Sequence, residues 1–81
     1  MLDDVFETLS SYKDESNIAS RYPNVKALID SLCTKIESYN KNNQLDSIKT
    51  ELRTAKDNND YDRLLAIILK NQETIKDKFK V

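Results

Sequence analysis

The sequence predicts an all-α fold, a small antiparallel four-helix bundle that forms a single domain over residues 1–81. Three observations predict it. Apolar residues recur at helical spacing in four segments, no segment alternates apolar and polar residues as a strand would, and the joints between the segments are short. Short connections place consecutive helices side by side. One core is expected, because a chain of this size hides only about 60% of the surface that its unfolded form exposes.

The first helix is expected at the very start of the chain, with Tyr12 extending it by a turn. Four apolar residues there share one helical face: Leu2, Val5, Phe6 and Leu9. The helical spacing is lost over residues 13–17. We expect Ile18 and Tyr22 to hold this connecting segment onto the core.

The second helix is expected to begin near Pro23, because a fixed φ angle and a missing N–H group suit the first turn of a helix. It has the most regular spacing in the chain, carried by Val25, Leu28, Ile29, Leu32, Ile36 and Tyr39. Residues 40–43 are expected to end it, since asparagine tolerates the left-handed conformation that closes helices. We expect Asn43 to cap the helix that follows.

The third helix has a narrower apolar face, formed by Leu45, Ile48, Leu52 and Ala55. The basic row Lys49, Arg53 and Lys56 is interpreted as a solvated face rather than a phosphate-binding one. The fourth helix is expected as a single final helix after the run at residues 57–62. Its apolar face consists of Tyr61, Leu64, Leu65, Ile68, Ile75 and Phe79.

The run DNNDYD at residues 57–62 has two readings, a cation-binding loop or a joint between helices. A calcium loop of the EF-hand type starting at Asp57 would place Tyr61, Asp62 and Ile68 at positions that need a ligand, a glycine and a glutamate. The register therefore favours a joint. We expect Asn59 or Asp60 to cap the last helix, and Asp62 to lie near its positive dipole end.

Composition excludes several classes of site. Thirteen basic and fourteen acidic residues leave a net charge of −1, so the broad positive field of a nucleic-acid-binding protein is missing. One cysteine and no histidine exclude an internal disulfide and a Cys/His zinc site, and the absence of glycine excludes the glycine-rich phosphate loops. No metal ion and no cofactor is expected.

The location is expected to be cytoplasmic. The longest apolar run spans six residues, 64–69, where a membrane-spanning helix needs about 20. The acidic start of the chain does not resemble an export signal.

No group of residues predicts catalysis, so an enzyme is not expected. Cys33 has no histidine to deprotonate it and is interpreted as a core thiol. Carboxylates such as Asp30 fall on polar faces and are expected to be solvated.

The apolar surface of the last helix is wider than one face, because Ala66, Ile67 and Leu69 extend it. Two interpretations stay open. Either the helix lies deep between its neighbours, or Ile67 or Leu69 is exposed and available to a partner.

In the order and lengths of its helices, the chain resembles the immunity proteins of pediocin-like (class IIa) bacteriocins, four-helix bundles that protect lactic acid bacteria from their own antimicrobial peptides. The likeness covers nearly the whole chain: SSYKDES ends a short first helix, VKALIDSLCTKIESY forms a long second one, and LDSIKTEL and RLLAIIL lie in the last two. The resemblance implies a protein partner, a complex of the peptide with a sugar-transporting membrane receptor, recognised largely by the C-terminal half. It thus implies partner contacts at Leu64, Ile67, Leu69 and Lys70.

Two further resemblances cover only the end of the chain. LLAIILKNQETIKDKF looks like the closing helix of the trafficking-adaptor bundles called GAT domains, and residues 48–79 are similar to the helical hairpin that ends bacterial primases and docks on the helicase. Both imply a docking module that binds another protein through its last two helices. All three resemblances imply a protein that presents a helical surface and performs no catalysis.

Overall fold

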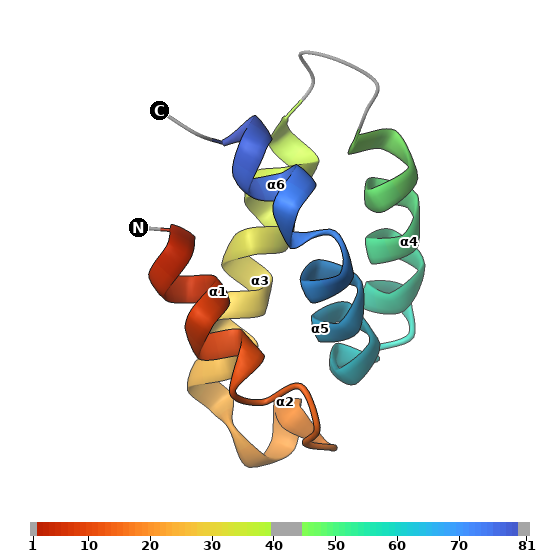
Figure 1. The fold of residues 1–81 in the computed structure, drawn as a ribbon. Coiled ribbons are helices and arrows are strands. Elements are labelled where there is room, and N and C mark those ends of the chain that lie inside the picture. Colours follow the sequence, from red (N-terminus) through yellow and green to blue (C-terminus); the bar gives the residue numbers. More distant parts are fainter. Residues whose placement is uncertain (1, 40–44, 80–81) are drawn as a thin grey trace.

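The computed structural model describes residues 2–39 and 45–79, except for the side chain of Leu2, and this part of the chain contains helices and no strand. Six helical segments form it: α1 (Leu2–Ser10), α2 (Ile18–Arg21), α3 (Pro23–Ser38), α4 (Asp46–Asp57), α5 (Tyr61–Lys70) and α6 (Gln72–Lys78) (Figure 1). The predicted all-α fold is confirmed. The segments number six rather than four because a short helix, α2, forms in the first connection and the last helix is divided in two.

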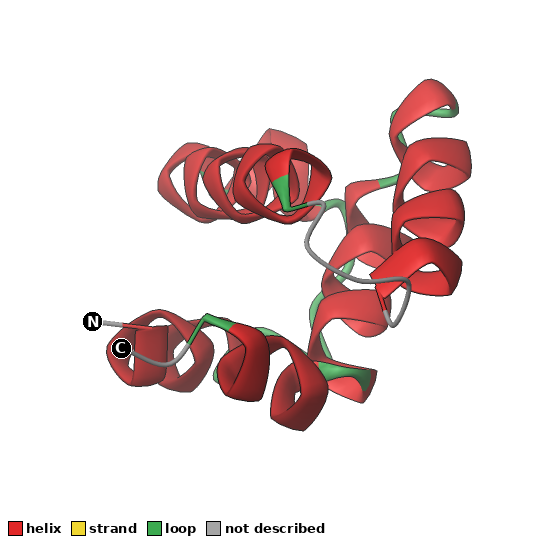
Figure 2. Ribbon diagram, turned by 90° about the horizontal axis from the view of Figure 1, so that it is seen from above, coloured by secondary structure: helices red, strands yellow, loops and turns green. Residues whose placement is uncertain are grey.

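Helix α5 lies at the centre of the fold. It packs against α1, α2, α3, α4 and α6 (Figure 1). Seen from above, α3 lies on one side of the molecule and α1 lies with α6 on the other (Figure 2). Helix α1 packs against α5 and α6, so α1 and α3 are held together chiefly through α5.

One hydrophobic core joins these helices, and every helix contributes at least one buried side chain to it. Phe6 and Leu9 of α1, Ile29 of α3 and Leu64 of α5 are each at most 1% exposed. No polar or charged side chain of the described ranges is buried with them. Burial of a large aliphatic side chain stabilises a fold by about 1.5–3 kcal/mol, so the core is the main source of stability.

The connection after α1 is anchored as expected, since Ile18 is 1% exposed and Tyr22 is half-buried. The unexpected feature is α2, a single helical turn that starts at Ile18. Asn17 precedes it with a φ of 54°, a left-handed conformation that asparagine tolerates. Pro23 then occupies the first turn of α3, as the sequence predicted.

The run DNNDYD, residues 57–62, forms the joint between α4 and α5. The amides of Asn59 and Asp60 donate to the carbonyls of Lys56 and Ala55, both at 2.9 Å, which is the Schellman pattern that ends helices. Asn59 takes the left-handed position with a φ of 53°. Asp60 caps α5, and its Oδ1 accepts from the amide of Arg63 at 3.2 Å. The prediction of a joint is confirmed, with Asp60 as the cap.

The expectation of one unbroken final helix is wrong, because the helix breaks at Asn71. There the side-chain Nδ2 of Asn71 donates to the carbonyl of Ile67 at 2.9 Å, and Gln72 Nε2 donates to that of Leu69 at 3.2 Å. The break lets α6 lean onto α1 while Ile75 stays in the core. Apolar spacing could not show it, since Ile68 and Ile75 are seven residues apart and share a face with or without a break.

Two further expectations concern the cap of the third helix and the possibility of a membrane-spanning helix. The cap of the third helix was expected at Asn43, which lies outside the described residues, and α3 itself ends at Ser38. The described helices include none that has the length and apolar content needed to cross a membrane.

Candidate interaction surface

The four residues expected to bind a partner lie at different depths of α5. Leu64 and Ile67 belong to the core, at 0% and 4% exposed. Leu69 is half-buried and Lys70 is exposed. The wide apolar surface of this helix therefore fits its central position among five neighbours, and only Leu69 and Lys70 of the four reach the surface.

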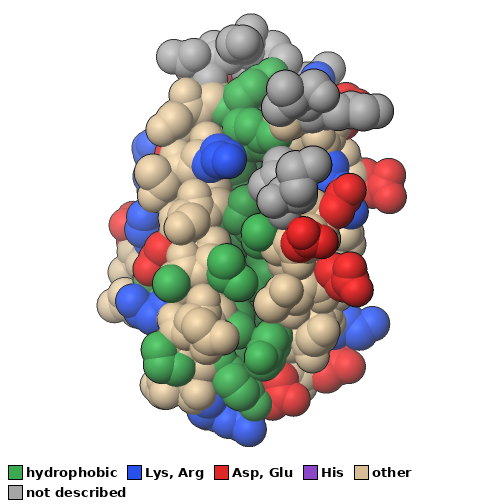
Figure 3. All heavy atoms as spheres, turned by 90° about the vertical axis from the view of Figure 1, so that its left-hand side faces the viewer, with side chains coloured by type: hydrophobic (Ala, Val, Ile, Leu, Met, Phe, Trp, Pro, Cys, Tyr) green, Lys and Arg blue, Asp and Glu red, His purple; other side chains and the backbone are tan. Residues whose placement is uncertain are grey.

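A second apolar surface lies where the sequence did not suggest one, between α1 and α3. We call it the apolar strip, and we define it by six of the half-buried side chains that pack on the core from α1, α3 and the residues next to the helices: Val5, Tyr12, Tyr22, Leu28, Tyr39 and Phe79. In Figure 3, apolar side chains run down this face of the molecule in a furrow between two ridges of mainly polar atoms. Among the described parts of the chain, this is the most continuous apolar feature that the face shows.

Helical spacing explains why these residues face the same way. Val5 and Tyr12 are seven residues apart, and Leu28 and Tyr39 are eleven apart, which are the spacings of two and three helical turns. Tyr12 lies in the turn that follows α1, and Tyr39 is the C-cap residue of α3. Within the described part of the chain, α1 packs chiefly against α5 and α6 rather than against α3, which leaves the strip partly open.

Two aromatic pairs close the ends of the strip. At one end the rings of Tyr12 and Tyr22 lie 4.7 Å apart with an interplanar angle of 57°. At the other end the rings of Tyr39 and Phe79 lie 5.1 Å apart with an angle of 71°. Pairs of this geometry contribute about 0.5–1.5 kcal/mol beyond the area they bury. They therefore tie α1 to the start of α3, and α6 to its end.

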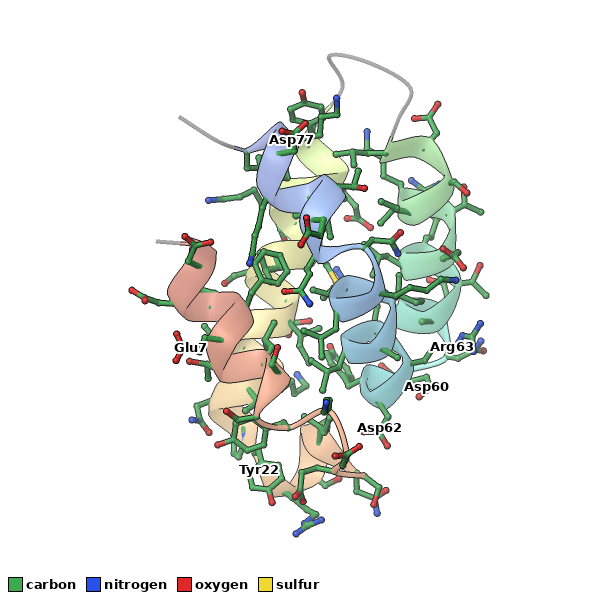
Figure 4. The ribbon with its side chains drawn as sticks, viewed as in Figure 1. Glu7, Tyr22, Asp60, Asp62, Arg63 and Asp77 are labelled. Carbon is green, nitrogen blue, oxygen red and sulfur yellow. The ribbon has the colours of Figure 1, made fainter. Side chains whose placement is uncertain are left out.

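Polar contacts hold the ring of Tyr22 in place (Figure 4). Its hydroxyl donates to Glu15 Oε1 at 3.0 Å, and Arg21 lies over the ring while it pairs with the same carboxylate at 3.2 Å. The hydrogen bond to Glu15, helped by partial burial, raises the pKa of Tyr22 above its usual value. The hydroxyl is thus a fixed donor at neutral pH.

Acidic side chains form the ridge on the α1 side of the strip. Asp3, Asp4 and Glu7 are exposed, and Glu7 points away from the molecule (Figure 4). Lys76 of α6 pairs with Asp3 at 3.6 Å and lies over the ring of Phe6. In the described parts of the chain, Asp4 and Glu7 have no ion-pair partner.

A small polar pocket of about 170 Å³ lies where α2 meets the start of α5, and Asp60 and Asp62 help to line it. Asp62 accepts from the backbone amides of Asn17 and Ile18, at 2.9 and 3.0 Å. This carboxylate thus ties the first connection to α5 (Figure 4). Sequence reasoning assigned Asp62 only to the dipole of its own helix, because nothing in the sequence relates positions 45 residues apart.

Asp30 was expected to be solvated, and it is so only in part, since its side chain is 37% exposed. The carboxylate is half-buried and accepts from the hydroxyl of Tyr61 at 2.8 Å. Lys26 pairs with it at 3.6 Å and lies over the Tyr61 ring. The hydrogen bond from Tyr61 to Asp30 is the main cause of a raised Tyr61 pKa. The three groups link α3 to α5 and have a structural role.

Cys33 is confirmed as a core thiol, since it is 0% exposed. Burial raises its pKa to about 11. The thiol is therefore protonated at neutral pH and is a poor nucleophile.

Comparisons of the chain with protein-family models, with curated proteins and with solved structures gave no match.

Proposed function

We propose that this protein is a non-enzymatic helical module that binds another protein through its apolar strip. The observation that carries the proposal is the strip itself, a row of half-buried aromatic and aliphatic side chains between α1 and α3. Interface centres are enriched in such residues and depleted of charge, whereas the rim around them is polar. The strip and its two polar ridges have that composition.

The strip is prepared for binding because its rings are already fixed. Both aromatic pairs, together with the hydrogen bond from Tyr22 to Glu15, restrict rotation before a partner arrives. Ordering a side chain on binding costs about 0.5–1.5 kcal/mol, so rings held in place lose less free energy when they are covered.

Within this class, we propose the role of an immunity protein against pediocin-like bacteriocins. The support is the resemblance in the helix order and lengths expected from the sequence, in which a short first helix precedes a long one and two more follow. The structure adds the short helix α2 and divides the last helix into α5 and α6. The test is expression in a strain sensitive to such peptides, where survival of cells carrying the protein is the expected outcome. Unchanged killing across a panel of pediocin-like peptides would exclude this role.

The contribution of the strip is tested in the same assay with Leu28→Gln. This change adds a polar group to the strip at a half-buried position, so the chain is expected to stay folded and to lose protection. The matched control is Ala27→Gln, one residue earlier on the same helix and exposed. Equal protection by both variants would show that immunity does not depend on the strip.

A second candidate function is a docking module of the adaptor or primase type, which binds through its last two helices. Leu69 favours it, because this half-buried leucine lies beside the exposed Lys70 on α5. Leu69→Asp is expected to abolish capture of a protein partner from a lysate while the fold is kept. Retention of every partner by the folded variant would exclude this mode.

A further inference from the structure

We propose that the occupant of the apolar strip is an amphipathic α-helix with basic residues along the edge of its apolar face that lies beside α1. This inference rests on the proposed function of the strip as a binding surface. It adds the chemistry of the partner, argued from the shape of the strip and from the charges along its α1 ridge.

The shape of the strip favours a helix. The strip follows α3, from the Tyr12–Tyr22 pair near its start to the Tyr39–Phe79 pair at its end. The sixteen residues of α3 span about 24 Å at the helical rise, which is the length of about four turns in a partner helix. A helix that lies in a groove places anchors at spacings of three, four and seven residues, so several could contact one straight strip.

The charges favour a basic partner. Asp3 and Asp4 lie in the first turn of α1, and the last turn of this helix carries no basic residue. Lys76 pairs with Asp3 only, which leaves Asp4 and Glu7 without an ion pair in the described chain. Lysine or arginine beside the apolar face of a partner would lie opposite these two carboxylates. Complementary charge of this kind raises the association rate and selects the partner.

The same charges disfavour two other occupants. An anionic membrane surface attracts basic segments, and the α1 carboxylates would be repelled by it. A second copy of this chain would bring a second set of the same carboxylates to the interface. Both alternatives are outcomes of the experiment below.

The experiment titrates the chain of residues 1–81 with two synthetic helical peptides of about 18 residues, which have identical leucine faces. One carries lysine beside the leucines and the other carries glutamate. Methyl signals of Val5 and Leu28 report where each peptide binds, and calorimetry gives the dissociation constants. The lysine peptide is expected to shift both signals and to bind about ten times more tightly than the glutamate peptide at low salt. This preference should weaken as salt screens the charges.

Two double variants distinguish the effect of the α1 carboxylates on binding from the effect of the net charge of the protein. Asp4→Asn combined with Glu7→Gln is expected to weaken binding of the lysine peptide about fivefold. The control is Asp46→Asn combined with Asp57→Asn, the same change in charge at two exposed positions of α4. We expect it to bind the lysine peptide as the unmodified chain does.

Each of the other outcomes overturns the proposal, and each shows which part of it is wrong. Equal or tighter binding of the glutamate peptide at the strip removes the charge preference and leaves the proposed function intact. Absence of shifts at Val5 and Leu28 with either peptide removes the helical occupant, and the protection assay with Leu28→Gln then decides the proposed function separately. Binding to phosphatidylglycerol vesicles, or a dimer that Leu28→Gln dissociates, would assign the strip to a membrane or to a second copy.

Discussion

At the scale of single residues, the Asp62 carboxylate shows how one side chain fixes the path of a distant segment. Its two oxygens accept from the amides of Asn17 and Ile18, the first donors of α2. Those amides have no carbonyl partner inside so short a helix, because the first turn of any helix leaves its N–H groups unpaired. A carboxylate from α5 satisfies them and fixes α2 against the centre of the fold.

The first prediction concerns this contact. Asp62→Ala is expected to lower the free energy of unfolding by about 1–2 kcal/mol, because two charge-assisted hydrogen bonds are lost near the surface. Asp14→Ala is the control, since Asp14 is an exposed carboxylate in the same connection. Urea denaturation followed by circular dichroism measures both. Equal stability of the two variants would show that Asp62 does not hold the segment.

The second prediction follows from the pKa of the Cys33 thiol, which burial raises from 9.0 to about 11. Below pH 9 the thiol is protonated in the folded and the unfolded chain, so its titration does not affect stability. Between pH 9 and 11 only the unfolded chain releases this proton, so the stability of the fold falls as pH rises. The raised pKa values of Tyr22 and Tyr61 act in the same direction.

Cys33→Ala isolates the contribution of the thiol. Its free energy of unfolding is expected to fall less steeply between pH 9 and 11 than that of the unmodified chain. In addition, the native thiol should react slowly with an aromatic disulfide reagent at pH 8 and quickly in urea. Fast reaction of the native chain would contradict burial of Cys33.

At the scale of elements, the division of the last helix determines how α6 packs. Helix α6 has seven residues and one buried side chain, Ile75, which is 0% exposed. Lys76 adds an ion pair to Asp3 and a contact with the Phe6 ring. A helix this short is not stable alone, so the Ile75 contact must hold it on the core.

The third prediction is that Ile75→Ala costs about 2–4 kcal/mol, from lost burial and the cavity that remains. The amides of α6 are expected to exchange with solvent faster than those of α5 in this variant. Thr74→Ala, at the exposed neighbouring position, should change stability by less than about 0.5 kcal/mol. Unaltered exchange of α6 amides in Ile75→Ala would mean that other contacts hold the helix.

At the scale of the whole molecule, α5 is the element on which the other five depend. It packs against each of the other described helices. Its side chains in the core include Leu64, Leu65, Ile67 and Ile68. The opposite sides of the molecule, α3 and the α1–α6 pair, are joined through this helix (Figure 2). Damage to α5 should therefore unfold the chain as a unit.

The fourth prediction tests this dependence. Ile67→Asp is expected to unfold the chain, because an unpaired carboxylate in the core costs more than about 4 kcal/mol against a total stability of about 5–15 kcal/mol. Ala66→Asp, which introduces the same charge at the adjacent exposed position, should remain folded. Helical circular dichroism at 222 nm distinguishes the two. A folded Ile67→Asp chain would mean that this part of α5 faces a partner rather than the core.

Local spacing in the sequence was enough to predict the helical content, the start of α3 near Pro23, most of the core residues and a joint at residues 57–62 with Asn59 or Asp60 as its cap. These features depend on neighbours within one or two helical turns, and local spacing records such neighbours directly. The packing of distant segments was needed to show that Ile67 belongs to the core, that α5 and α6 are separate helices, that Asp62 holds α2 in place and that an apolar strip lies between α1 and α3. Each of these depends on which distant segments meet, and the spacing of residues along one helix carries no record of the helix it will face.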